Sequence, residues 1–156
     1  MRPRTASSPT RQSAQGGSAM VEFALGATIL VALFTGIYQY GYTFYVYNCL
    51  QNAVRAGARY ASRETYDSPT RTPSNNFYTS VRNTVVYGDP NASSGSTTAP
   101  GLTTSQVILK VDFAREVPTT MTVSINGYSI NAVMRSFTLS NKPQASMPFI
   151  GIFAPE

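Results

Sequence analysis

The residues of this chain with the clearest chemical potential lie at the start of its apolar segment. Glu22 follows Ser18 by four residues and directly precedes a run without charged side chains, Phe23 to Val54. A carboxylate at the edge of a bilayer is costly unless it is paired. Cleavage between Gly17 and Ser18 would create an α-amino cation one helical turn from Glu22, so the two charges could pair within or between chains. The alternative is an acid in the headgroups, favoured there by the helix dipole.

No residue pattern in the chain is typical of catalysis. The sequence has no histidine, which removes Ser–His and Cys–His pairs and imidazole metal ligands. The seven acidic residues show no metal-ligand spacing, and no glycine-rich phosphate loop is present. Cys49 is the single cysteine, so it is either a small buried or lipid-facing side chain or a partner in an intermolecular disulfide. The sequence therefore predicts a protein that is not an enzyme and that holds no metal or cofactor.

The charge balance points to a membrane surface and away from nucleic acid. The 156 residues carry a formal charge of +5, yet only 12% of them are charged. Six of the twelve basic side chains gather on both sides of the apolar run, where cations meet lipid headgroups. They are Arg2, Arg4 and Arg11 before the run and Arg55, Arg59 and Arg63 after it.

The apolar run is long enough to cross a bilayer as a helix. A hydrocarbon core of about 30 Å needs about 20 helical residues, which residues 23–42 supply. This length exceeds the apolar part of a cleaved signal peptide. A cluster of tyrosine and phenylalanine residues from Tyr38 to Tyr47 marks the exit interface. Residues 1–17 lack apolar anchors and are predicted to be an unstructured leader.

The helix is predicted to continue to Glu64 with two distinct faces. Gln51, Arg55, Arg59 and Arg63 recur every four residues as a polar stripe. This stripe is interpreted as a headgroup contact or solvated face, with a partner contact as the alternative. Ala53, Gly57 and Ala61 form a stripe of small residues that permits close helix packing. Its packing surface is either the chain's own globular part or another subunit, and the remaining alternative is a solvated helix face.

Residues 65–156 are predicted to form a small α+β domain. A loop leads to an amphipathic helix over 76–87, with Phe77, Val81 and Val85 inward and Gly88 ending it. A loop over 91–104 follows, and then strands over 106–113 and 119–125. Asn126-Gly127 predicts a type I′ hairpin joining 119–125 to a strand over 128–139, and a fourth element is expected near 147–153. The predicted fold class is α+β, a long helix packed on a small antiparallel sheet.

Several stretches of the sequence resemble TadE-like proteins, the pseudopilins of tight-adherence (Tad) pili. The likeness covers the chain from about Gly16 to Gly88 and includes the run from Gly17 to Leu25. The other stretches that carry it are 40–45, 51–61 and 81–88. The resemblance implies a pilin-like fold and a structural role in pilus biogenesis, adhesion, biofilm formation or secretion.

The resemblance also implies processing by a prepilin peptidase on the cytoplasmic side of the bacterial inner membrane. The cut would fall after Gly17, making Ser18 the first residue and Glu22 the fifth. Phe23 stands where major pilins often have tyrosine, which favours a minor pseudopilin. The implied organisation is a cytoplasmic leader (1–17), a transmembrane helix with its extension (18–64) and a periplasmic domain (65–156). The implied partners are prepilin peptidase, other pilins or pseudopilins, inner-membrane pilus machinery and the bilayer; the alternative is an unprocessed single-pass anchor.

Overall fold

The computed structural model describes residues 13–132 and 135–154, and the described elements confirm the predicted α+β class. The chain divides into two compact units, one ending at Tyr38 and the other beginning at Gln39. The elements are helices α1 (Ser13–Arg63), α2 (Asn75–Tyr87) and the 3₁₀ helix η1 (Thr104–Gln106), and strands β1 (Val107–Ala114), β2 (Val117–Ile125), β3 (Tyr128–Asn131), β4 (Ser136–Leu139) and β5 (Gln144–Pro148).

Helix α1 begins earlier than the sequence predicts. Its first residue is Ser13, so residues 13–17 of the expected unstructured leader are helical, while residues 1–12 lie outside the described part. No proline interrupts the chain between Pro9 and Pro69, and Gly16-Gly17 lowers helix propensity without removing a backbone donor. In the apolar part, Thr28 donates its hydroxyl proton to the Ala24 carbonyl at 2.8 Å. Such local bonds satisfy hydroxyl groups where no water is available.

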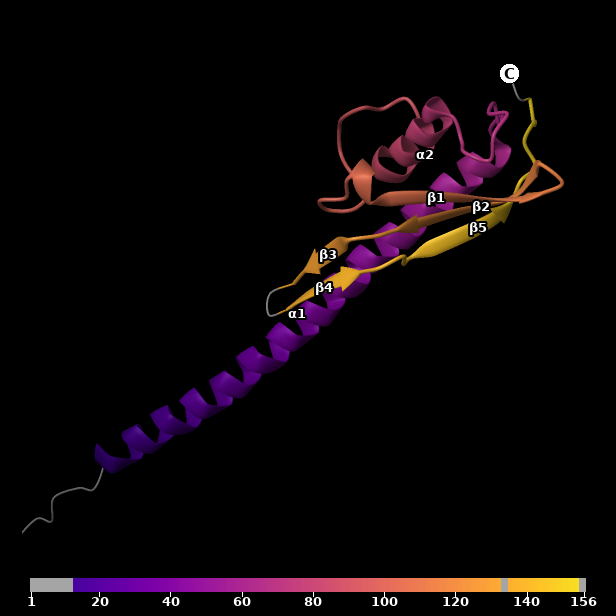
Figure 1. Cartoon of the computed structure of the whole chain (residues 1–156). Helices are drawn as coiled ribbons and strands as arrows, with labels where there is room; N and C mark the ends of the chain where they lie inside the picture. The colour runs from indigo at the N-terminus through magenta and orange to yellow at the C-terminus, as the bar shows by residue number, and fades with distance from the viewer. Residues whose placement is uncertain (1–12, 133–134, 155–156) are drawn as a thin grey trace, which may run out of the picture. The chain divides into compact units, whose positions relative to one another are not determined.

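The core of the unit from Gln39 onward lies between α1, α2 and the sheet. The α1 contribution is one helical face that includes the fully buried Leu50 and Val54. Helix α2 lies beside β1 (Figure 1) and buries Phe77, Val81 and Val85, the three residues predicted to point inward. Ser74 caps its first turn by accepting a hydrogen bond from the Phe77 amide, and Gly88 ends the helix in the left-handed conformation.

The predicted hairpin at Asn126-Gly127 is wrong. Strand β2 pairs with β1 on one edge and β5 on the other, both antiparallel, whereas β3 pairs with β4 in a separate two-stranded sheet. Gly127 has a φ of 72°, but Asn126 is not among the positive-φ residues, so the type I′ condition is not met. The predicted strand over 128–139 is instead the two strands of the β3–β4 hairpin, and the fourth element, β5, begins at Gln144.

The two-residue turn of the three-stranded sheet lies at Arg115-Glu116. Ala114 pairs with Val117, and both central residues have positive φ, 50° for Arg115 and 64° for Glu116. A two-residue turn with positive φ at both central residues usually has the sequence Asn-Gly. The Glu116 carboxylate accepts a 2.7 Å hydrogen bond from Arg71, and this contact lowers the pKa of Glu116. The pair is well exposed, so it contributes little to the stability of the fold.

Tyr66 lies in the segment that follows α1 and binds the backbone of residues 152–154. Its ring makes edge contacts with Phe77 and Phe113 at centroid distances of 5.6 Å and 5.8 Å. Its amide donates to the Ile152 carbonyl at 2.8 Å, and its carbonyl accepts from the Ala154 amide at 3.1 Å. Its hydroxyl donates to the Thr70 carbonyl. Burial raises the pKa of this phenol above its ordinary value of 10.0, and the nearby Asp67 adds to the effect.

This raised pKa predicts a loss of stability at alkaline pH. The unfolded chain ionises Tyr66 at about pH 10, whereas the folded chain keeps it neutral to higher pH. The stability linked to this group is therefore complete below about pH 10 and falls as pH rises through the raised pKa. We expect Tyr66→Phe to flatten the alkaline fall of Tm in detergent-solubilised chain followed by circular dichroism. Parallel Tm profiles for both proteins would contradict this expectation.

Candidate functional site

The predicted processing and pairing residues lie on consecutive turns of α1. Gly17, Ser18, Glu22 and Phe23 are all exposed, and Phe23 exposes 75% of its surface. Ser18 and Glu22 are four residues apart in one helix, so they are separated by about 6 Å along its axis. Among the described residues, no basic side chain forms an ion pair with Glu22. Glu22, the first carboxylate of α1, therefore has no ion-pair partner among the described residues.

The helix around this carboxylate exposes large apolar side chains on all sides. Within residues 17–63, α1 is the one described helix long and apolar enough to cross a membrane, with a mean hydropathy of 2.0 in its best window. None of that window is buried inside the structure. A helix that is apolar all round is stable in lipid or between other apolar helices, not in water. The exposed set includes Met20, Val21, Phe23, Leu25, Ile29, Leu30, Val31, Leu33, Phe34 and Ile37.

The small-residue stripe is buried within the unit from Gln39 onward, and its glycine lies against α2. Ala53, Gly57 and Ala61 are buried, and a Cβ built on Gly57 would overlap Val85 Cγ2. Of the two packing surfaces left open from the sequence, the structure therefore supplies the intramolecular one. Gly57 is needed here because α1 and α2 approach too closely for any side chain.

The arginine stripe faces away from that core. Arg55, Arg59 and Arg63 are all exposed, and within residues 13–132 and 135–154 no carboxylate pairs with them. They form a row of cations on the surface of α1 opposite to the Gly57 contact. Such a row is available to water or to an acidic partner.

A shallow groove lies beside the buried face of α1. It has a volume of about 380 Å³ and is lined by Cys49, Asn52, Ala53, Ala56, Thr84, Gly88 and Thr98. Cys49 is half-buried and packs against the core, which fits the small-side-chain interpretation of this residue. The lining is mostly apolar and holds no charged side chain. In the described part of the chain, no three metal-ligating side chains come together.

Sequence reasoning missed Gln39. This amide is buried, with 8% of its surface exposed, and its Nε2 donates to the Arg135 carbonyl at 3.2 Å. The partners are 96 residues apart in the chain, so no local pattern reveals the contact. The one available signal is the amide itself, the single glutamine within residues 23–42.

A family model described as TadE-like protein matches residues 17–59. The chain carries a TadE-like segment. The match begins at Gly17 and includes Glu22, the apolar helix surface and two arginines of the stripe, which confirms the predicted resemblance over this segment. Of the stretches that carried the resemblance, 17–25 and 40–45 lie within the matched segment and 51–61 overlaps its end. The stretch 81–88 lies outside it.

The long apolar helix indicates a single-pass membrane protein. Comparison with curated proteins found no match, and comparison with solved structures found none.

Proposed function

We propose that this chain is a minor pseudopilin of a Tad-type pilus, cut after Gly17 and packed with other pilins through its apolar helix. The observation that carries the proposal is the start of the TadE-like match at Gly17, on a helix whose large apolar side chains are exposed. The chain would support pilus biogenesis and, through the pilus, adhesion, biofilm formation or secretion. Its partners would be prepilin peptidase, other pilins and the inner-membrane pilus machinery.

The charges at the start of α1 support a defined order of events. Before cleavage, Glu22 is a carboxylate at the edge of the apolar helix with no basic partner among the described residues, which is unfavourable at the bilayer edge. Cleavage on the cytoplasmic side of the inner membrane creates the α-amine of Ser18 about 6 Å away along the axis. The amine then neutralises Glu22, within the chain or from a neighbouring subunit.

The apolar surface of α1 supports transfer from lipid to a helix bundle. Lipid tails and apolar side chains offer similar solvation, so helix association in a membrane depends on packing and polar contacts. A charge pair between Ser18 of one subunit and Glu22 of the next would fix the axial offset between neighbours. The domain from Thr65 onward would stay on the periplasmic side or on the filament surface.

The alternative is an unprocessed single-pass anchor whose periplasmic domain binds an envelope or pilus-machinery partner. Arg55, Arg59 and Arg63 are exposed. This row of cations could bind an acidic partner without any pilus assembly, which favours the anchor. The two functions differ in the mature N-terminus. Retention of residues 1–17 is expected of the anchor, and a chain that starts at Ser18 is expected of the pseudopilin.

Deletion and complementation test the proposed function. Cells that lack this chain should lose sheared surface filaments and pilus-dependent attachment, and the wild-type chain should restore both. The shorter chain should also be found in sheared filaments or in membrane complexes with other pilins. Normal filaments and attachment in the deleted cells would contradict a role in pilus biogenesis.

A further inference from the structure

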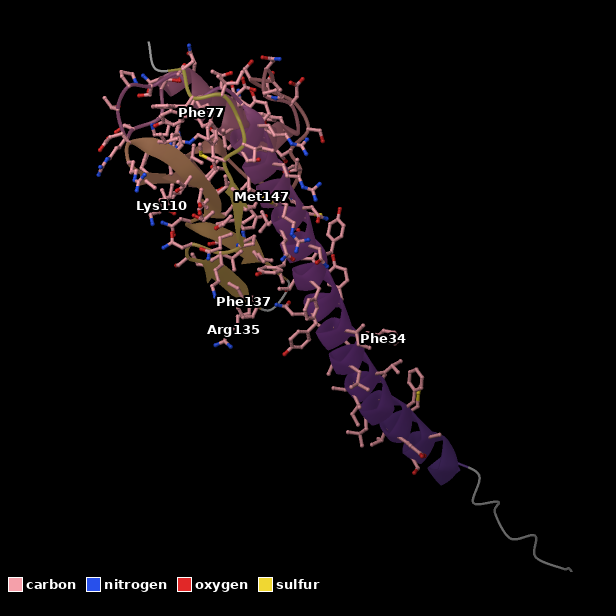
Figure 2. The ribbon with its side chains drawn as sticks, turned by 90° about the vertical axis from the view of Figure 1, so that its right-hand side faces the viewer. Phe34, Phe77, Lys110, Arg135, Phe137 and Met147 are labelled. Carbon is pink, nitrogen blue, oxygen red and sulfur yellow. The ribbon has the colours of Figure 1, made fainter. Side chains whose placement is uncertain are left out.

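The β3–β4 hairpin lies against α1 near the predicted exit from the bilayer. Gln39 is buried there, and its side-chain amide donates to the carbonyl of Arg135, the residue directly before β4. Figure 2 shows Arg135 and Phe137 at one end of the unit from Gln39 onward, with Phe77 at the other. The hairpin end therefore lies at the level of Gln39 on the helix.

When residues 23–42 cross the hydrocarbon core, that level lies just inside the core boundary, because Gln39 is about 4.5 Å of helix from Tyr42 and the headgroups. On α1, Tyr40, Phe44 and Tyr45 expose 68%, 67% and 60% of their surfaces, as aromatic residues do at a membrane interface. On the hairpin, Arg135 is exposed and Phe137 exposes 43% of its surface. Phe137 stands out on β4, where its neighbours Ser136 and Thr138 are polar.

The arginine stripe of α1 lies too far from the same headgroups. Arg55 follows Tyr42 by 13 residues, which is about 20 Å of helix. The headgroup region on one side of the bilayer is only about 5–8 Å thick. Attraction to an anionic surface also falls off over about 8 Å in physiological salt. In a helix close to the bilayer normal, Arg135 reaches the lipid phosphates and Arg55 does not.

We propose that the β3–β4 hairpin is a second membrane contact of this chain, with Arg135 binding the phosphates of anionic phospholipids and Phe137 entering the interface. The inference rests on the membrane span of the proposed function. It assigns the headgroup contact to the hairpin and leaves the row of Arg55, Arg59 and Arg63 for water or an acidic partner. The hairpin contact also sets the height of the domain above the lipid surface.

Site-specific fluorescence quenching tests this contact in the full-length chain. The chain is placed in phosphatidylcholine vesicles with and without phosphatidylglycerol, in a Cys49→Ala background, with some lipids carrying a nitroxide on the headgroup. A bimane label is attached through Ser136→Cys on the hairpin. Ser94→Cys, in an exposed loop, is the control for water, and Leu33→Cys is the control for the span.

The hairpin label should be quenched by headgroup nitroxides, and more strongly when phosphatidylglycerol is present, while the Ser94 label should not. Arg135→Gln should lower the ratio of bound to free hairpin about fivefold, the effect of one arginine at an anionic surface. The matched Arg55→Gln should leave it unchanged. Phe137→Ser should weaken quenching in both lipid mixtures.

Two outcomes would overturn the inference while leaving the span intact. One is a Ser136 label no more quenched than the Ser94 label while lipids with a nitroxide in the acyl chain still quench the Leu33 label. The other is an equal effect of Arg135→Gln and Arg55→Gln. Loss of quenching at Leu33 as well would instead remove the span, and with it both the hairpin contact and the proposed function.

Discussion

Replacing Gly57 by valine should destabilise the unit from Gln39 onward by about 3 kcal/mol, the upper range for inserting groups into a packed core. A Cβ at this position overlaps Val85 Cγ2, and Val85 is fully buried. Valine in a helix strongly prefers one rotamer, so Val85 cannot turn away cheaply. The measurement is thermal and denaturant unfolding of the detergent-solubilised chain.

A double-mutant cycle separates this overlap from a general effect of the glycine. Gly57→Ala alone gains helix propensity but creates the overlap, and Val85→Ala alone leaves a cavity. The double variant places the new methyl group where the Val85 methyl was. Its loss of unfolding free energy should therefore be smaller, by about 1–3 kcal/mol, than the summed losses of the two single variants. Gly41→Ala is the matched control, because a Cβ there meets nothing within 4 Å. Additive losses would show that α1 and α2 do not pack as described.

Replacing Glu22 by leucine should leave processing intact but lower incorporation into sheared filaments at least about a hundredfold. Breaking a buried ion pair costs about 3–5 kcal/mol, because the remaining charge loses its partner. Here the remaining charge is the α-amine of Ser18, buried among apolar helices in the proposed assembly. The measurement is the ratio of this chain in filaments to that in membranes, determined by quantitative mass spectrometry.

Asp112→Asn is the matched control for this charge. Asp112 pairs with Lys110 at 3.1 Å in an exposed position, where an ion pair contributes about 1 kcal/mol at most. Incorporation should be unchanged by this variant. Equal incorporation of Glu22→Leu and the wild-type chain would mean that the carboxylate has no assembly role, and that the headgroup interpretation of Glu22 is the correct one.

The helical part of the fold was accessible from the sequence because its signals are local. The uncharged run and the continuing four-residue spacing predicted α1 to within one residue of its end at Arg63. Ser74 and Gly88, as N-cap and C-cap, bound α2 through contacts with their own neighbours. The start of α1 was misplaced because Gly16-Gly17 disfavours a helix without removing a backbone donor, as a proline would.

The strand pairing was less accessible because it depends on distant residues. Asn126-Gly127 is a strong local turn signal, yet β5 occupies the edge of β2 that the predicted hairpin needed. The tight turn forms instead at Arg115-Glu116, where both residues have positive φ against their local preference. The Glu116 carboxylate of this turn contacts the distant Arg71. The contact between Gln39 and Arg135 has the same origin. Tertiary packing overrides local propensity at each of these positions.

The mature N-terminus is the most direct test of the central claim. Intact-mass and N-terminal peptide analysis should be made on the chain extracted from membranes of cells with and without an active prepilin peptidase. The chain should begin at Ser18 only when the peptidase is active, and Gly17→Ala should abolish this shortening. A chain that keeps residues 1–17 in cells with active peptidase would contradict it.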